Sequence, residues 1–308
     1  MKNKKGLVIG VANQKSIAWG ISEVLSKEGA NLALTYQGNS FKKRVQPLAE
    51  SIGSELIFDV DVQDESALDS CFKKISDEWG SIDFLVHAVA FSEKSELMGR
   101  FINTSRENFL KSIDISCYSL IDVSKRALPL MNRGGSILTL SYLGAQRVTP
   151  NYNVMGIAKA ALESTVRYLA SDLGEENIRV NAISAGPMKT LAGAAIGGAR
   201  RVFRLSEQNS PLGSNPNLMS VGGAAAFLLS DYGMHTSGEV LFVDGGYHVM
   251  GMPKLDHIEK DFSNEDSYCR GILNHKIWEI EKKFGWHPSF LSQSGQDKII
   301  FDIFFRRN

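Results

Sequence analysis

Tyr152 and Lys159 are the two residues of this sequence whose types and spacing best suit proton-transfer chemistry. If residues 152–159 are helical, a separation of seven residues is close to two turns, so both side chains lie on one face. A nearby ammonium favours the phenolate and makes a tyrosine a better proton donor, and the amine can also hold the ribose of a cofactor. Helical Tyr and Lys pairs also occur with a structural role only, so the position of the pair after a predicted strand matters.

Gly10 and Ser16 lie in a turn with features of a phosphate site. The turn spans residues 10–20 and follows the first predicted strand. Gly10 allows a tight turn and a close approach of phosphate to the backbone, and Ser16 is a good N-cap for a helix whose first amides would face an anion. Because the GxGxxG pattern is missing, the segment fits either a dinucleotide site or an ordinary glycine turn before a capped helix.

Further cofactor contacts are predicted at the ends of the next strands. Gln37 stands where NAD sites usually offer Asp or Glu to the adenosine ribose, and it can bind a ribose hydroxyl without charge. The basic residues 42–44 could instead neutralise the extra phosphate of NADP, so NAD is favoured and NADP is the alternative. At the third and fourth strand ends, Asp61 and Val62 could hold the adenine, and Val89 could line the cofactor.

The elements that must position these residues form a regular alternation. Short β-branched runs alternate with longer helical patterns from the start of the chain to about residue 246. Strands that are apolar on both faces and alternate with helices predict a parallel sheet covered on both sides. The sequence therefore predicts one α/β domain over residues 1–252, built on a doubly wound Rossmann-type sheet of about seven strands. The strands are expected at residues 6–12, 31–36, 55–62, 82–89, 136–142, 178–185 and 239–246.

Residues 253–308 do not continue this alternation and are predicted to form a C-terminal extension. The extension is richer in aromatic residues than a typical disordered linker. Four apolar residues would share one face of a short helix near 267–284. Three roles stay open for the extension: an adventitious addition, a docking helix and a contact between subunits.

Composition narrows the class of protein. The chain has 308 residues with 34 basic and 34 acidic side chains, so no bulk attraction to nucleic acid or to an anionic membrane is expected. No apolar run approaches the roughly 18 residues that cross a bilayer. The three cysteines are far apart and the six histidines lack metal-ligand spacing, so neither disulfides nor a metal site is predicted. The expected location is a reducing cytoplasm.

Five segments resemble the enoyl-acyl-carrier-protein reductases of bacterial fatty acid synthesis, a divergent branch of the short-chain dehydrogenase/reductase superfamily. They are GVANQKSIAWGI, TYQ, SYLGAQRVTPNYNVMGIAKAALE, RVNAISAGP and GEVLFVDGG, and the resemblance runs from about residue 3 to residue 252. Carbonyl-reducing members of the superfamily place lysine four positions after the tyrosine. Here Gly156 holds that position and Lys159 follows at seven, an offset that separates double-bond reductases from their carbonyl-reducing relatives.

The resemblance implies roles for individual residues. Tyr142, Tyr152 and Lys159 would be catalytic, with Tyr152 as the acid or oxyanion partner and Tyr142 shaping the pocket. Residues 188–205 would form a mobile substrate loop. The implied cofactor contacts are Gly10, Ser16, Ile17, Gln37, Asp61, Val62, Val89, Lys159, Met188, Lys189, Thr190, Leu191 and Ala192. The expected substrate contacts are Phe91, Ser92, Tyr142, Tyr152, Met155, Ala192 and Ile196.

The implied reaction is reduction of the trans-2 double bond of an enoyl thioester by hydride transfer from NADH, the last step of the fatty acid elongation cycle. Negative charge moves onto the thioester oxygen and needs a hydrogen-bond donor. The resemblance also implies a homotetramer and transient docking of acyl carrier protein, whose acidic surface would meet Arg200, Arg201 and Arg204. Two alternatives stay open: a carbonyl-reducing short-chain dehydrogenase and a non-catalytic NAD-binding scaffold.

Overall fold

Seven strands form one parallel sheet in the order β3-β2-β1-β4-β5-β6-β7 in the computed structural model, which describes residues 1–191, 193 and 198–254. The order reverses between β1 and β4, where ligands of such sheets usually bind. The predicted doubly wound α/β fold of Rossmann type is thus confirmed. The strands are β1 (Lys5–Ile9), β2 (Asn31–Tyr36), β3 (Leu56–Asp59), β4 (Ile82–His87), β5 (Met131–Ser141), β6 (Arg179–Ala185) and β7 (Val240–Val243).

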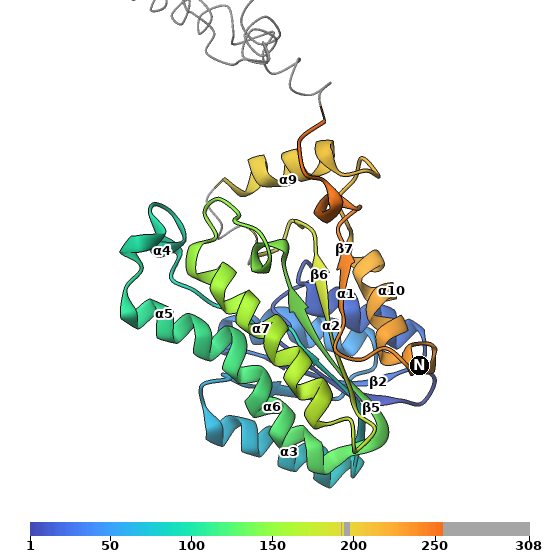
Figure 1. Cartoon of the computed structure of the whole chain (residues 1–308). Helices are drawn as coiled ribbons and strands as arrows, with labels where there is room; N and C mark the ends of the chain where they lie inside the picture. Colours follow the sequence, from blue (N-terminus) through green and yellow to red (C-terminus); the bar gives the residue numbers. More distant parts are fainter. Residues whose placement is uncertain (192, 194–197, 255–308) are drawn as a thin grey trace, which may run out of the picture. The chain divides into compact units, whose positions relative to one another are not determined.

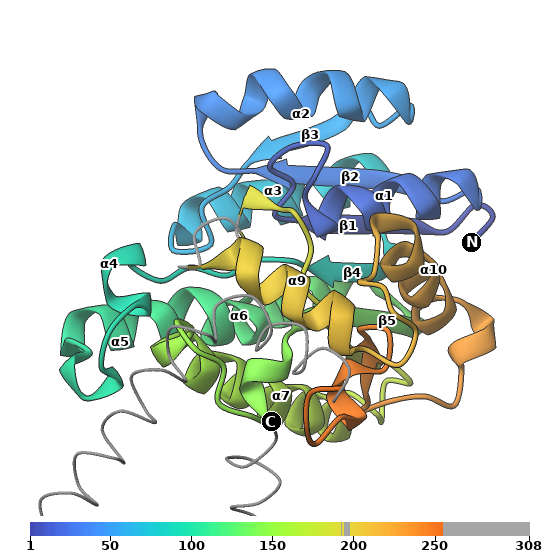
Figure 2. The ribbon, with the colours of Figure 1, turned by 90° about the horizontal axis from the view of Figure 1, so that it is seen from above.

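Helices cover both faces of the sheet (Figures 1 and 2). Leu7 and Val8 on β1 show why two separate cores form, because successive strand residues point to opposite faces. Leu7 packs into one core and Val8 into the other, and both are fully buried. The Leu7 core is covered by α3 (Glu65–Trp79), α6 (Ser119–Ala127) and α7 (Asn153–Asp172). The Val8 core is covered by α1 (Ile17–Lys27), α2 (Asn39–Ser51) and α10 (Leu218–Leu229).

Shorter elements surround the carboxyl ends of the strands. Figure 1 shows α9 (Ala199–Asn209) beyond the upper ends of the strands, and α4 (Lys94–Leu97) next to α5 (Arg106–Ile113). A π-helical turn, Asp114–Tyr118, joins α5 to α6, and such turns are frequent at functional sites. The described 3-10 turns are Phe101–Asn103, Leu128–Leu130, Leu143–Ala145, Asp231–Gly233 and Tyr247–Val249.

Five strands, β1, β3, β4, β5 and β7, end earlier than predicted. At two of these ends, local interactions turn the chain. β1 ends at Ile9 since Gly10 adopts a φ of 101°. β7 ends at Val243 because the carboxylate of Asp244 accepts hydrogen bonds from the amides of Gly246 (2.9 Å) and His248 (2.8 Å). Both terminations lie at the edge of the sheet where the candidate site residues gather.

The contacts of the chain divide it into two compact units, Met1–Gly251 and Met252–Asn308. The first unit contains the whole seven-stranded sheet. The helix predicted near 267–284 lies outside the described residues. Among the helices that are described, none is long and apolar enough to span a bilayer.

Candidate active site

Gly10 occupies the point where β1 and β4 separate, and no other residue type fits there. A Cβ at this position would lie 2.4 Å from the carbonyl oxygen of Ala88 and 3.3 Å from the side chain of Val89. The positive φ of 101° also favours glycine. The Gly10 amide donates to Thr35 Oγ1 at 3.1 Å, which ties the turn to β2. The predicted cofactor residues Gly10 and Val89 therefore meet at the switch point of the sheet.

Ser16 caps helix α1, as the sequence predicts. Its Oγ accepts a hydrogen bond from the Trp19 amide (3.4 Å) and donates one to the Asn13 carbonyl (2.7 Å). Ile17 is the first residue of the helix and packs against the core. The first amides of a helix have no intrahelical acceptor and carry a partial positive charge, so this end of α1 suits an anion.

Gln37 and Asp61, predicted separately as cofactor contacts, lie in contact with each other. The Gln37 amide nitrogen donates to Asp61 Oδ2 at 2.7 Å across the ends of β2 and β3. The Gly38 amide donates to Asp59 Oδ1 at 2.6 Å, so a second carboxylate lies at the same edge. Val62 is half-buried against the core below. The side-chain carbonyl oxygen of Gln37 can accept a hydrogen bond from a ribose hydroxyl. The carboxylates of Asp59 and Asp61 would repel a further anionic group bound at this edge.

Tyr152 and Tyr142 form the centre of the site. Tyr152 immediately precedes α7, is 7% exposed, and packs with Leu97 and Met155. Its ring meets that of Tyr142 edge to face, with the centroids 5.0 Å apart. Burial, followed by the charge of Tyr142, raises the pKa of Tyr152 well above its ordinary value, so the phenol stays protonated. Burial also raises the pKa of Tyr142 to about 12.

Two glycines allow close packing around Tyr152. A Cβ at Gly144, in the turn after β5, would lie 2.4 Å from that ring. A Cβ at Gly156 on α7 would lie 2.9 Å from the Gly144 carbonyl oxygen. The close approach of α7 to this turn explains why position 156, four residues after Tyr152, holds no side chain.

Lys159 lies on α7 beneath the carboxyl end of β5. Its side chain is buried, and its ammonium donates to the Leu140 carbonyl at 2.8 Å. Burial lowers the pKa of Lys159 to about 8, although the charges of Cys117 and Glu163 act in the opposite direction. The prediction that this ammonium favours the Tyr152 phenolate stays a prediction. In the structure, burial dominates and raises the pKa of Tyr152.

A buried polar group supports Lys159 from the same helix and was not predicted. Glu163, one turn further along α7, accepts from Ser141 Oγ (2.6 Å) and Gln146 Nε2 (3.2 Å). On the neighbouring strand, His87 contacts Thr139 Oγ1 (2.9 Å) and Ser119 Oγ (2.8 Å). Burial and the charge of Lys159 lower the pKa of His87 to about 3, so the imidazole is neutral at physiological pH.

The predicted substrate residues Phe91 and Ser92 follow β4 and are held by polar groups on α5 and the π-helical turn. The Phe91 amide donates to Ser116 Oγ (2.9 Å), which in turn donates to the Phe91 carbonyl (3.1 Å). The Phe91 ring is 38% exposed and lies 4.6 Å from Lys111 Nζ. Ser116 was not predicted, because a single polar residue within a helical pattern does not indicate such a contact.

The segment after β6 carries the remaining predicted contacts. Met188 packs against the α1 and α10 core, and Thr190 Oγ1 accepts from the Gly193 amide at 2.9 Å. Lys189 and Leu191 are exposed, and Lys189 Nζ lies 4.9 Å from the Phe203 ring of α9. Ala192 and Ile196 lie outside the described residues, and residues 199–205 of the predicted substrate loop belong to α9.

Comparison with known proteins places this geometry in a family. A family profile described as enoyl-(acyl carrier protein) reductase matches residues 10–248. The chain belongs to this family. It is 53% identical over 256 residues to "Enoyl-[acyl-carrier-protein] reductase [NADH] 1" of Rhizobium meliloti, which covers 83% of this chain and 94% of the relative.

Solved structures of the enoyl reductase family share the fold. The chain is 55% identical to an enoyl-acyl-carrier-protein reductase from Anaplasma phagocytophilum in complex with NAD, with a TM-score of 0.79 over 83% of this chain and 96% of that one. It is 44% identical to the Bacillus cereus enoyl-acyl carrier protein reductase with NADP+ and indole naphthyridinone, with a TM-score of 0.80 over 82% of this chain and 98% of that one.

Proposed function

We propose that this chain is an NADH-dependent enoyl-acyl-carrier-protein reductase, which reduces the trans-2 double bond of enoyl thioesters in the last step of the fatty acid elongation cycle. The observation that carries the proposal is the position of Tyr152 and Lys159. Both are buried near the carboxyl end of β5, at the edge of the parallel sheet where the Gly10 turn also lies. The lysine follows the tyrosine at seven residues, the spacing of double-bond reductases.

The residues around the β1–α1 turn fit a dinucleotide. Gly10 has no side chain to block a ligand from its backbone, and the first amides of α1 suit a pyrophosphate. Ser16 and Ile17 would hold that group, and Gln37 would accept from the adenosine ribose. When bound, NADH supplies the hydride. The full set proposed to contact it is Gly10, Ser16, Ile17, Gln37, Asp61, Val62, Val89, Lys159 and residues 188–192.

Tyr152 supplies the hydrogen bond that the thioester oxygen needs when negative charge develops on it. Its raised pKa supports this role, because a protonated phenol is the donor form. One N–H of Lys159 donates to the Leu140 carbonyl, and the others would be available to the cofactor ribose. Tyr142 packs its ring edge to face against Tyr152 and contributes to the burial of that residue, which is 7% exposed. The acyl chain would lie among Phe91, Ser92, Tyr142, Tyr152, Met155, Ala192 and Ile196.

The charges around Gln37 support NADH over NADPH. An NADPH phosphate would approach the carboxylates of Asp59 and Asp61, both engaged at this edge. The basic residues 42–44 are exposed on α2, and the guanidinium carbon of Arg44 lies 5.8 Å from the Phe41 ring on the same helix. We therefore keep NADPH as the weaker cofactor.

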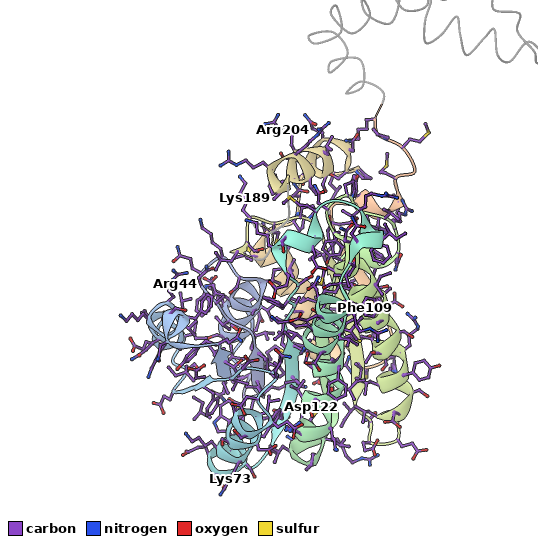
Figure 3. All side chains as sticks on the ribbon, turned by 90° about the vertical axis from the view of Figure 1, so that its left-hand side faces the viewer. Arg44, Lys73, Phe109, Asp122, Lys189 and Arg204 are labelled. Carbon is purple, nitrogen blue, oxygen red and sulfur yellow. The ribbon has the colours of Figure 1, made fainter. Side chains whose placement is uncertain are left out.

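Acyl carrier protein is the proposed donor of the substrate, and α9 is its proposed docking element. Arg200, Arg201 and Arg204 are exposed on this helix. Figure 3 shows Arg204 directed away from the body of the molecule, with Lys189 below it. An acidic carrier surface would be attracted to this group of cations, mainly through faster association.

A cytoplasmic homotetramer is the proposed assembly. Apolar side chains are exposed along α5, α6 and α7, including Leu110 (58%), Ile121 (40%) and Tyr168 (77%). Exposed apolar surface of this kind suits contact with a second copy. Light scattering coupled to size-exclusion chromatography measures the mass directly, and a monomer would remove this part of the proposal.

The proposed reaction is tested by following NADH absorbance with crotonyl and longer enoyl thioesters. We expect turnover with NADH to exceed turnover with NADPH, and Lys159→Ala to lower kcat/KM by about 100-fold, since the positioned amine is lost. Lys73→Ala is the matched control, because Lys73 is exposed on α3, at the opposite end of the molecule from Arg204 in Figure 3. Undiminished turnover in Lys159→Ala would remove the role assigned to Lys159.

The same assay separates the alternatives. A carbonyl-reducing short-chain dehydrogenase would oxidise NADH with keto substrates and not with enoyl thioesters. A non-catalytic scaffold would bind NADH, measured by quenching of tryptophan fluorescence, and turn over neither class of substrate. The seven-residue spacing of Tyr152 and Lys159 favours the enoyl substrate over both alternatives.

A further inference from the structure

Asn153 directly follows Tyr152 and has an unusual backbone. Its φ is 35°, within the left-handed region that non-glycine residues rarely occupy. Asparagine tolerates this region better than other non-glycine residues, but such a conformation still needs support from its surroundings. The side chain provides that support, because Asn153 Nδ2 donates to the Glu96 carbonyl at 3.0 Å and the Gly99 carbonyl at 3.4 Å. The amide therefore ties the turn that carries Tyr152 to helix α4.

Helix α4 is itself fixed by side chains. The Glu96 carboxylate accepts from the amide and the hydroxyl of Ser105, both at 2.8 Å, and from Asn108 Nδ2 at 3.3 Å. Leu97 is buried and packs with Tyr152 and Met155. Helix α4 therefore forms a fixed support against the Tyr152 ring, although it is only four residues long.

Asn108 continues the connection to the predicted substrate segment. Its side chain is 2% exposed, and its Oδ1 accepts from the Glu93 amide (2.9 Å), from Ser92 Oγ (3.2 Å) and from Ser112 Oγ (3.2 Å). An unbroken series of hydrogen bonds thus runs from Asn153 through Glu96 and Asn108 to Ser92. It joins the two sides of the proposed acyl site, which are far apart in the sequence.

We propose that Asn153 is a positioning residue for enoyl reduction, which holds the Tyr152 phenol at a set distance from the Phe91–Ser92 segment through helix α4. The inference rests on the proposed function for its catalytic meaning. Asn153 contacts neither reactant and acts through Tyr152. A displacement of the donor by about 1 Å is enough to lower a rate by about 100-fold, so a short tether at this point matters.

The test is Asn153→Gly in the full chain, because glycine keeps the left-handed backbone and removes only the tether. Asn177→Gly is the matched control, since Asn177 also has a positive φ (59°) and lies between α7 and β6. We expect Asn153→Gly to lower kcat by about 10- to 100-fold with KM for NADH within about twofold of wild type. The melting temperatures of the two variants should agree within a few degrees.

A second measurement is independent of activity. Hydrogen–deuterium exchange should become faster at the amides of residues 94–99 in Asn153→Gly and stay unchanged there in Asn177→Gly, because only the first variant releases α4. A wild-type chain without enoyl turnover would end the proposed function, and the exchange experiment would still decide whether Asn153 fixes α4.

Asn153→Asp resolves the case in which the glycine variant fails to fold. Aspartate keeps the size and the left-handed tolerance of asparagine, but its carboxylate cannot donate to two carbonyls. We expect the same loss of kcat and the same faster exchange. The inference is overturned if either variant retains more than half of the wild-type kcat, or if kcat, NADH affinity and melting temperature fall in parallel.

Discussion

Lys159, which we propose as a contact of the cofactor ribose, has a buried side chain, and burial disfavours its charged form. Its pKa is lowered to about 8, so the ammonium persists at neutral pH and is lost just above it. His87 is a buried imidazole on β4 with a pKa of about 3, so it stays neutral at neutral and alkaline pH. Of these two groups, only Lys159 changes charge near pH 8.

We therefore predict that kcat/KM for NADH falls as the pH rises through about 8. The sign follows from the direction of the pKa shift: below about 8 Lys159 is protonated and attracts the cofactor, and above it the amine is neutral. Steady-state assays from pH 6 to pH 10 measure this alkaline limb.

Lys159→Arg is the control for the pH profile. The guanidinium stays charged over the whole range, so this variant should show lower activity but no alkaline limb. A limb that persists near pH 8 in Lys159→Arg would assign the ionisation to another group.

At the scale of elements, the turn Leu143–Ala145 and helix α7 approach each other so closely that both need glycine. Gly144 creates the space in which the Tyr152 ring lies, and Gly156 lets α7 approach the Gly144 carbonyl. The elements around Tyr152 therefore position it by shape, in addition to the hydrogen bonds of Asn153.

We predict that Gly144→Ala lowers both activity and stability. The added Cβ would lie 2.4 Å from the Tyr152 ring, so either the ring or the turn must move. Overpacking of this kind destabilises by about 1–3 kcal/mol. Thermal unfolding and enoyl turnover measure the two effects.

Gly223→Ala is the matched control for this substitution. Gly223 is exposed on α10, and a Cβ there meets no atom within 4 Å. Alanine should stabilise the helix by about 0.5–1 kcal/mol and leave turnover unchanged. Equal effects of the two substitutions would contradict the packing explanation.

At the scale of the whole molecule, the chain divides into two compact units. The unit Met1–Gly251 contains the sheet and the described site residues. The match to the Rhizobium meliloti relative covers 94% of that relative and 83% of this chain.

We predict that a chain truncated after Lys254 folds and keeps turnover with enoyl thioesters within about twofold of the full chain, because both hydrophobic cores lie before this point. Circular dichroism and the NADH assay check folding and activity. If truncation abolishes turnover while the fold persists, the extension contributes to the site or to the assembly.

The sequence by itself determined the features that depend on local patterns. The alternation of apolar strands and helices predicted the parallel sheet. A serine directly before a helical pattern predicted the Ser16 cap of α1. The spacing of Tyr152 and Lys159 predicted a helix over residues 152–159, because helical periodicity relates residues that are close in the chain. In the structure α7 begins one residue later, so Lys159 lies on it and Tyr152 immediately precedes it.

Only the tertiary structure decided the features that join distant segments. The Gln37–Asp61 bond links residues 24 positions apart, and the Asn153–Glu96 bond links residues 57 positions apart. The lowered pKa of Lys159 and the raised pKa of Tyr152 also depend on burial by several elements at once. No periodicity in the sequence specifies these hydrogen bonds and pKa shifts. Each arises where the folded backbone brings the ends of separate strands and the starts of separate helices to one edge of the sheet.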